Sequence, residues 1–427
     1  MNTGMISSKK EHWLQKLLIA VLCLYAGSLY IGYINDTLLS LQGLTLYAMV
    51  GVLLLVILQR GSIKLNSYTV WYGIFMIFAI LSCIYATNRS MAAAGLYPVL
   101  IVLIFSVAMA MVITRRAHME YLFYAMVFGS VILTVYLAVT GKFSDYTDVG
   151  DRFGGELTGN ANVFASVYMI AAAASVYFMF RMKTARGKLL FLATFISQLY
   201  ALVVSGGRKY FIFPFILIYL MALQKRDKKS RIHIIRVSIL FAALVFAVYM
   251  LIMKVEFLYE NIGYRFEDLI DYTLDQSTDV EGGTIIRQKM VDRGMELWRS
   301  SPILGHGMDM FTAISGFGVY SHNNFVELLC NHGLLGFIWY YGFYIYLLIK
   351  LLKNKRNDTL KHFLIGFVAA LFVYETGAVA YDTLVTQMFL MFASIYLFLP
   401  SEEDAAVAQL PKANAATAEA SGEDGKH

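Results

Sequence analysis

Runs of about 20 consecutive apolar residues recur along this chain, and this feature restricts its possible folds more than any other. A helix rises about 1.5 Å per residue, so a run of this length crosses the hydrocarbon core of a bilayer. Of the 427 residues, 59% are hydrophobic and only 15% are charged, whereas soluble domains contain about 25% charged residues. The sequence therefore predicts an all-α polytopic membrane protein, and it contains no pattern that predicts nucleic-acid binding.

Twelve apolar runs are candidates for transmembrane helices. The run at 210–223 is short for a bilayer and could form half of a broken pair with the run before it. We expect about twelve spans and a large extracytoplasmic loop that contains short amphipathic helices. The candidate spans lie at about 16–34, 41–58, 68–86, 95–113, 121–140, 161–180, 188–204, 210–223, 235–253, 334–352, 362–381 and 384–399.

The distribution of lysine and arginine predicts the orientation. With a cytoplasmic N-terminus, most of the 35 basic residues fall in segments that face the cytoplasm, and every short inside loop is basic. We therefore expect both chain ends in the cytoplasm and no cleavable signal peptide. The expected division is 1–253 with nine spans, 254–333 as the large outside loop, 334–399 with the last spans, and 400–427 as a disordered tail.

Two adjacent cations, Arg208 and Lys209, separate two apolar runs on the side that the positive-inside rule disfavours. Charges at such a position need a partner, and the two preceding glycines would let the backbone approach a ligand closely. One interpretation is a phosphate-binding site at the outer face. The alternative is that both side chains extend to lipid head groups.

The large loop is acidic from Lys254 to Glu281 and then acquires spaced cations from Gly282 on. Apolar residues at helical spacing in the second half predict an amphipathic helix at about 285–299. Thr284 is the expected N-cap, and the Ser-Ser-Pro sequence at 300–302 is expected to end the helix. The predicted apolar face consists of Ile286, Met290, Leu297 and Trp298.

Arg287 would then lie in the first turn of this helix, where a cation opposes the helix dipole. An anion bound at that N-terminus would reverse the effect, because free N–H groups and the guanidinium would both face it. The alternative is a solvated surface arginine or one paired with a glutamate. That simpler interpretation better fits Arg293 and Arg299.

His322 follows Ser321, a good N-cap, at the start of another predicted helix that should break at Asn331-His332-Gly333. A helix N-terminus disfavours the imidazolium, so we expect His322 to be neutral near pH 7. A neutral imidazole at a membrane surface can accept a proton from a sugar hydroxyl. The alternative is a structural histidine, and His306 and His332 fit a role in turns better than one in chemistry.

No metal or disulfide site is expected. The three cysteines lie in apolar runs without motif spacing, and no cluster of histidine, cysteine and aspartate has the spacing of metal ligands. If the protein is an enzyme, its cations would perform the role that a metal ion performs elsewhere.

Several of these segments together resemble the O-antigen polymerase and O-antigen ligase superfamily of bacterial envelope polysaccharide assembly. The resemblance extends from about residue 150 to 350, and the earlier helices match only in hydropathy. Its most specific part is the last pair of segments. The matching segments are RFGG at 152–155, GNANVFA at 159–165, SGGRK at 205–209, Arg287, WRSSPILGHG at 298–307, and SHN at 321–323 followed by GLLG at 333–336.

The resemblance implies a reaction at the outer face of the bacterial cytoplasmic membrane. A sugar hydroxyl would attack a glycan linked to undecaprenyl pyrophosphate, with inversion expected, and no cofactor would be required. His322 would activate the acceptor hydroxyl, and Arg208 and Arg287 would bind the pyrophosphate and stabilise its developing charge. The resemblance implies substrate binding for Arg152, Lys209 and Asn323.

Three functions remain open from the sequence. The favoured one is polymerisation of lipid-linked repeats into O-antigen or capsular polysaccharide, working with a flippase and a chain-length regulator. The second is an O-antigen ligase that transfers the glycan to lipid A–core. The third is a transporter, which should show several ionisable residues within its spans and two similar halves. Here Glu375 is the clearest mid-span ionisable residue, and the polar residues gather on one face.

Overall fold

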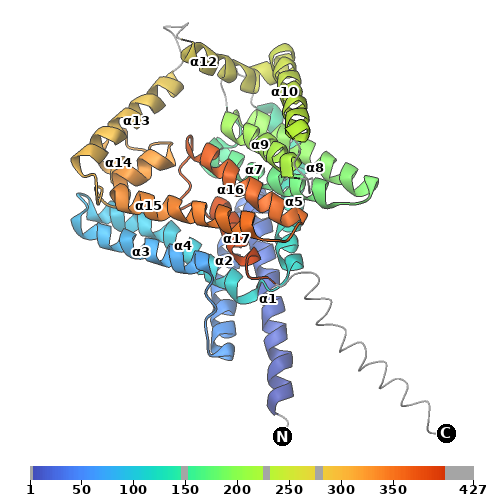
Figure 1. Ribbon diagram of the computed structural model, residues 1–427, viewed down its shortest axis with the longest axis vertical. Helices are drawn as coiled ribbons and strands as arrows, with labels where there is room; N and C mark the ends of the chain where they lie inside the picture. The colour runs from blue at the N-terminus through green and yellow to red at the C-terminus, as the bar shows by residue number, and fades with distance from the viewer. Residues whose placement is uncertain (1–2, 146–151, 225–230, 275–281, 400–427) are drawn as a thin grey trace, which may run out of the picture.

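The computed structural model describes residues 3–145, 152–224, 231–274 and 282–399, and these ranges form helices and no β-strand (Figure 1). The predicted tail at 400–427 lies outside the described residues. The helices with at least eight residues are α1 Thr3–Ile31, α2 Asp36–Arg60, α3 Ser67–Tyr85, α4 Arg89–Val112, α5 Arg116–Val139, α7 Ala161–Arg181, α8 Ala185–Val204, α9 Arg208–Gln224, α10 Arg231–Lys254, α12 Tyr264–Thr273, α13 Gly282–Ser300, α15 Asn324–Lys353, α16 Thr359–Glu375 and α17 Leu384–Tyr396. Shorter helices are α6 Gly155–Thr158, α11 Glu256–Leu258 and α14 Met310–Ile314, and a π-helix spans Tyr259–Gly263.

Nine helices of the described ranges are long and apolar enough to cross a membrane, namely α1 to α5, α7, α8, α10 and α15. The predicted all-α polytopic fold is therefore confirmed. The other three predicted spans form helices at the predicted places, but α9 and α16 have 17 residues each and α17 has 13. A 13-residue helix is about 20 Å long, which is shorter than the hydrocarbon core.

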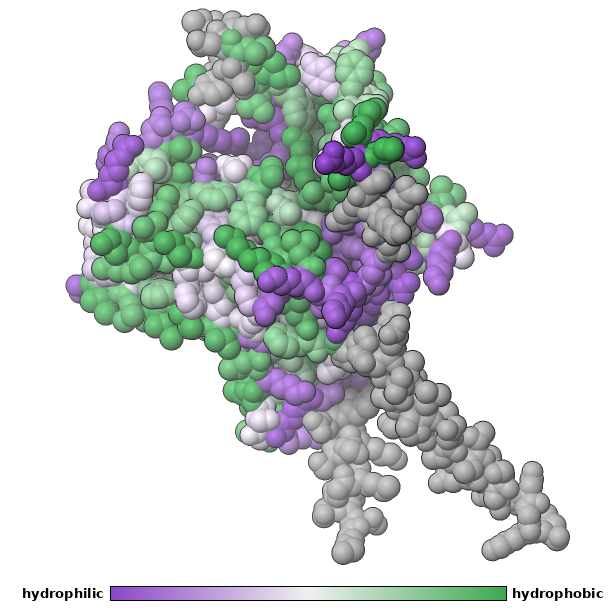
Figure 2. All heavy atoms as spheres, viewed as in Figure 1, coloured by the Kyte–Doolittle hydropathy of each residue, from purple (hydrophilic) through white to green (hydrophobic). Residues whose placement is uncertain are grey.

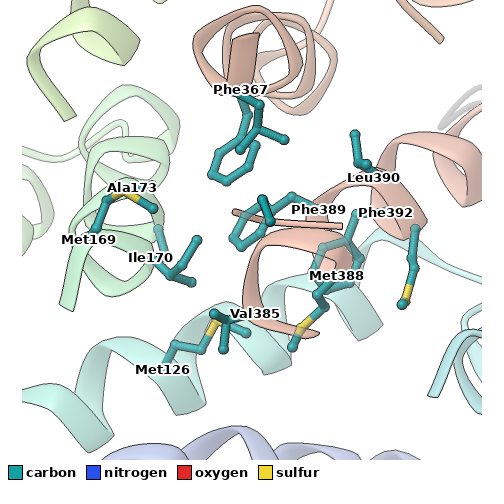
Figure 3. Packing of buried hydrophobic residues seen from close by; sticks show 14 of the residues in the cluster. Met126, Met169, Ile170, Ala173, Phe367, Val385, Met388, Phe389, Leu390 and Phe392 are labelled. Atoms are coloured by element: carbon teal, nitrogen blue, oxygen red, sulfur yellow. The ribbon is translucent and has the colours of Figure 1, made fainter. Parts of the chain in front are cut away.

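The short helix α17 lies inside the bundle rather than against lipid. All its residues from Val385 to Tyr396 are buried, and Figure 3 shows several of them, such as Val385 and Phe389, among side chains of α5, α7 and α16. The rings of Phe367 and Phe389 stack there with centroids 4.1 Å apart. Because protein surrounds α17, its length is set by its neighbours and not by the bilayer.

The amphipathic helix α13 packs on α15 at the periphery of the bundle (Figure 1). Met290 and Leu297 are buried against Phe311 and Cys330, and Gly294 lets α15 approach, since a Cβ there would lie 2.2 Å from Val326 Cγ1. Figure 2 shows hydrophilic residues gathered over α13, beside a more hydrophobic face. The helix and its end at Ser300 were predicted correctly.

Two details of the α13 prediction were wrong. Ile286 is 45% exposed, because the buried cluster begins one turn later, at Met290. The helix already includes Gly282 and Gly283, so Thr284 lies inside it and is not the N-cap. Arg287 therefore lies in the second turn, where the unpaired N–H groups of a helix terminus are out of its reach.

Helix α15 runs from the loop after α14 into a membrane span through a kink at Gly333, where the backbone has φ 62° and ψ −165°. This is the predicted break after His332. The kinked segment pairs with the loop 302–307: Leu334 N–H donates to Pro302 O at 2.9 Å, and Gly307 N–H donates to Asn331 O at 2.8 Å. The loop that follows α13 is thereby fixed to the middle of α15.

Replacing Gly333 by alanine is expected to destabilise the protein by about 2–4 kcal/mol. The new Cβ would lie 2.3 Å from Ile303 O, on a backbone conformation that L-residues rarely adopt. Gly342→Ala in the same helix is the matched control, because a Cβ there meets nothing within 4 Å. Thermal unfolding of the two variants in detergent would measure the difference, and equal melting temperatures would contradict the prediction.

Candidate functional site

A cavity of about 350 Å³ lies where the turn between α8 and α9 meets α12, α13 and the end of α16. Five cationic side chains line it, and none of its described lining residues is acidic. The cations are Arg152, Arg208, Lys209, Arg265 and Arg287. Cations from four separate segments thus converge, and their shared charge favours an anionic ligand of several charges.

The turn at 205–207 brings Arg152 and Arg265 together. Arg152 Nε donates to Ser205 O at 2.9 Å, and Arg152 Nη2 donates to Asn162 Oδ1 at 2.9 Å. Gly206 has φ 62°, and a Cβ there would lie 3.1 Å from Arg265 Nε. A glycine is required here for both reasons, because the conformation is left-handed and the two arginines approach the backbone closely.

Arg208 and Lys209 form the opposite wall at the start of α9. The Arg208 guanidinium donates to Arg265 O, and the Lys209 ammonium donates to Gly377 O at the end of α16. The ammonium also lies 4.9 Å from the ring centroid of Tyr210. Because α9 begins at Arg208, the positive end of its helix dipole adds to the field of the cations.

The cations lower one another's affinity for protons. Burial first, and then the positive charge of Arg265, lower the pKa of Arg152 below its ordinary value. Arginine pKa values lie far above 7, so the four guanidiniums remain charged. Burial and the charges of Arg287 and Arg152 lower the pKa of Lys209 to about 7. Asp268 on α12 offsets part of this positive charge at Arg208, and a bound polyanion would offset more of it.

His322 lies beside this cavity in a loop that α15 holds in place. Ser321 N–H donates to Glu327 Oε2 at 2.7 Å, and His322 itself has φ 57°, a left-handed conformation that few non-glycine residues adopt. The predicted cap was wrong: Asn323 is the N-cap, and its Oδ1 accepts from Phe325 N–H and Val326 N–H. The Ser321 backbone is instead held by Glu327, six residues along the chain, and the Ser321 hydroxyl donates to Asn323 O at 2.8 Å.

The imidazole of His322 is neutral, as predicted, but not mainly because of the helix terminus. Burial lowers its pKa to about 4, and the charges of Arg287, Lys209 and Arg152 add to this effect. Its Nδ1 is buried and finds no hydrogen-bond partner among the described residues. The ring of Tyr320 packs against it at 4.3 Å between centroids.

His322 is expected to titrate near pH 4, instead of near pH 6.5 as an ordinary histidine does. A pKa depressed by burial and by cations means that the neutral form persists as the pH falls from 8 to 5. NMR titration of histidine-labelled protein in detergent would measure this, with His322→Gln to assign the signal. A midpoint near 6.5 would mean that the ring is not held beside the cations.

The structure brings most of the predicted site residues together. Arg152, Arg208, Lys209 and Arg287 line one cavity, and the charges of Arg287, Lys209 and Arg152 act on His322. Asn323, the residue after His322, caps α15. His306 instead caps the end of α13, with Nε2 2.9 Å from Leu297 O. His332 is buried against the ring of Phe75.

Sequence reasoning missed two members of the site. Arg265 was assigned to the acidic half of the large loop, yet it lines the cavity from α12. Tyr320 lies within hydrogen-bonding reach of Asn160 and Asn162 and packs on His322. The available signal for Arg265 was its isolation, since it is one of only two cations among many acidic residues from Lys254 to Glu281.

These features define a class: a multi-pass membrane protein with a cationic cavity and a neutral histidine next to it. A family model described as O-antigen ligase matches residues 190–341. This match confirms the resemblance to the O-antigen polymerase and ligase superfamily over a segment that contains four of the five cavity cations and His322. Arg152 lies outside the matched range. A search of curated proteins gives no match.

Proposed function

We propose that this protein polymerises oligosaccharide repeats linked to undecaprenyl pyrophosphate into O-antigen or capsular polysaccharide. The reaction would take place at the outer face of the bacterial cytoplasmic membrane, with both chain ends in the cytoplasm. The observation that carries the proposal is the convergence of five cations beside a neutral histidine. Four of these cations and the histidine lie in the segment that matches the O-antigen ligase family.

The cavity would hold the pyrophosphate of the donor. Arg208 and Arg287 would contact the phosphate oxygens, with Arg152, Lys209 and Arg265 completing the positive wall. As the bond from the anomeric carbon to the phosphate oxygen breaks, both electrons pass to the leaving lipid pyrophosphate. The cations then stabilise the transition state more than the ground state, which is the requirement for catalysis. No metal ion is required for this part of the reaction.

His322 would accept the proton of the acceptor hydroxyl as its oxygen bonds to the anomeric carbon. A pKa near 4 describes the empty site. The negative charges of a bound pyrophosphate would offset Arg287, Lys209 and Arg152, so the pKa of His322 would rise when the donor is present. The imidazole would thus become a useful base only in the complex, and a single displacement of this kind inverts the anomeric carbon.

A second candidate is transfer of the finished glycan to lipid A–core, because the matching family model is described as O-antigen ligase. Both reactions use the same donor chemistry and differ only in the acceptor. A flippase that delivers the donor and a chain-length regulator are expected partners for either reaction.

Deletion of the gene in its host, with glycans analysed on a gel, tests the proposal. Loss of long chains with single repeats still attached to their acceptor supports polymerisation. Accumulation of long chains on the lipid carrier, without transfer, supports the ligase. Unchanged surface glycans would reject both, and restoration by the wild-type gene is the control for effects on neighbouring genes.

A further inference from the structure

The residue two positions after His322 is unusually well anchored. Asn324 is fully buried, and its backbone N–H donates to Ala378 O at 3.1 Å. Its Oδ1 accepts from Ala380 N–H at 3.0 Å and from Tyr381 N–H at 3.3 Å. The first residue of α15 is thereby bonded three times to the loop that connects α16 and α17.

The side-chain amide of Asn324 also reaches Glu375, the last residue of α16. Asn324 Nδ2 donates to Glu375 Oε2 at 2.9 Å and to the Tyr341 hydroxyl at 3.0 Å. Tyr341 in turn donates to Glu375 Oε2 at 2.8 Å, and Tyr344 donates to Oε1. A buried carboxyl group is costly unless its oxygens are bonded in this way, so the geometry of the group is tightly determined.

This junction connects the two halves of the candidate site. Glu375 lies two residues before Gly377, whose carbonyl accepts from the Lys209 ammonium at the wall of the cavity. Asn324 lies two residues after His322. The connection from the histidine to the cationic wall therefore consists of the backbone from His322 to Asn324, the hydrogen bond from Asn324 to Glu375, and the backbone from Glu375 to Gly377.

We propose that Asn324 and Glu375 are positioning residues that hold His322 at its working distance from the cationic cavity. This inference rests on the proposed function for its effect on turnover. The simpler alternative is a buried polar pair that stabilises the fold and has no specific effect on the site. A 1 Å misplacement of a reacting group can cost about 10²-fold in rate, so the two interpretations differ measurably.

Exchanging the side-chain types of Asn324 and Glu375 distinguishes the positioning role from a purely stabilising role. Asn324→Asp alone places a second acceptor against the Glu375 carboxyl group and removes the donor. The double variant Asn324→Asp with Glu375→Gln inverts the network: Gln at 375 donates to Asp at 324. The Tyr341 hydroxyl can reverse its bonds, since a hydroxyl both donates and accepts. The backbone N–H groups of Ala380 and Tyr381 keep an acceptor throughout.

The first measurement is elongation by purified protein with a lipid-linked repeat as donor. Asn324→Asp is expected to lower kcat about tenfold or more and to change KM less than about threefold, because the cavity cations stay in place. The double variant should recover kcat to within about threefold. Thr134→Val is the stability control, since it removes a buried bond to Tyr168, neither residue lines the cavity, and the change should leave kcat unchanged.

The second measurement does not depend on activity. Carbethoxylation modifies only the neutral imidazole of His322, and peptide mass spectrometry measures its rate. The rate at pH 5.5 is divided by the rate at pH 7.5, so that the effect of accessibility, which is common to both rates, cancels. The wild-type ratio should lie near one. In Asn324→Asp the ring would leave its buried position beside the cations, its pKa would approach 6.5, and the ratio would fall to about one tenth. The double variant should restore the wild-type ratio.

The two measurements distinguish the possible failures. If the wild type transfers no sugar but the modification ratio changes as expected, the proposed function is wrong and the positioning role holds. If the wild type is active and Asn324→Asp retains both its kcat and its ratio, the positioning role is wrong. If neither activity nor a change in ratio is found, both are rejected. Equal losses of kcat in Thr134→Val and Asn324→Asp would also reject positioning.

Discussion

Replacement of His322 by alanine is expected to reduce chain elongation by about 10²- to 10⁴-fold, the usual contribution of general acid–base catalysis. The protein should still reach the membrane and bind the lipid pyrophosphate, because the cavity is lined by other residues. Elongation by purified protein, together with a check of its amount in the membrane, would measure the effect. In cells, the proposed polymerisation predicts single-repeat glycans for the variant and long chains for the wild type.

The backbone at His322 determines the best control. Its φ of 57° is unfavourable for alanine but is one that asparagine adopts more readily. His322→Asn therefore keeps the loop conformation while removing the base. We expect both variants to be inactive. Recovery of activity in His322→Asn but not in His322→Ala would show that the position matters for its conformation and not for proton transfer.

Hydropathy and charge in the sequence predict some residues of the candidate site but not others. Arg208 and Lys209 were recognisable because their charge interrupts apolar runs, and this local anomaly is visible without any long-range contact. Arg265 was missed, because its isolation among acidic residues does not reveal its contact with the turn at Gly206, about 60 residues earlier in the chain. A local composition rule assigned it to the acidic segment that surrounds it.

The start of α15 illustrates a second limit. Ser321 and Asn323 are both good N-caps, and local preference cannot choose between them. The choice depends on Glu327, which bonds the backbone of Ser321, and on Asn324, which bonds the loop after α16. The predicted neutrality of His322 was right although the predicted cause was not, since burial and cations outweigh the helix terminus.

The lengths of the last helices illustrate a third limit. Apolar runs predicted all twelve apolar helices, but they did not distinguish helices that face lipid from helices enclosed by protein. Helix α17 is buried along nearly its whole length, and so the bilayer thickness does not act on it directly. Hydropathy measures the free energy of transfer out of water, and this free energy is favourable both in lipid and in the interior of a protein.

Arg287→Ala is expected to weaken binding of the donor pyrophosphate by about 10- to 100-fold, because a hydrogen bond to a charged group contributes about 1.5–3 kcal/mol. Turnover should fall as well, since the leaving group gains charge in the transition state. Arg287→Lys should recover only part of the loss, because an ammonium cannot make the two parallel bonds of a guanidinium to phosphate. The loss should shrink at high salt, where exposed charges are screened.

Arg293 on the same helix provides the matched control. It lies about one and a half turns further along α13, where its guanidinium pairs with Glu296 at 3.0 Å and does not line the cavity. Arg293→Ala removes the same charge from the same helix and should leave donor binding unchanged. Binding of lipid pyrophosphate to purified protein at two salt concentrations compares the variants. Equal losses for Arg287→Ala and Arg293→Ala would mean that the net charge of the outer surface, and not the cavity, attracts the donor.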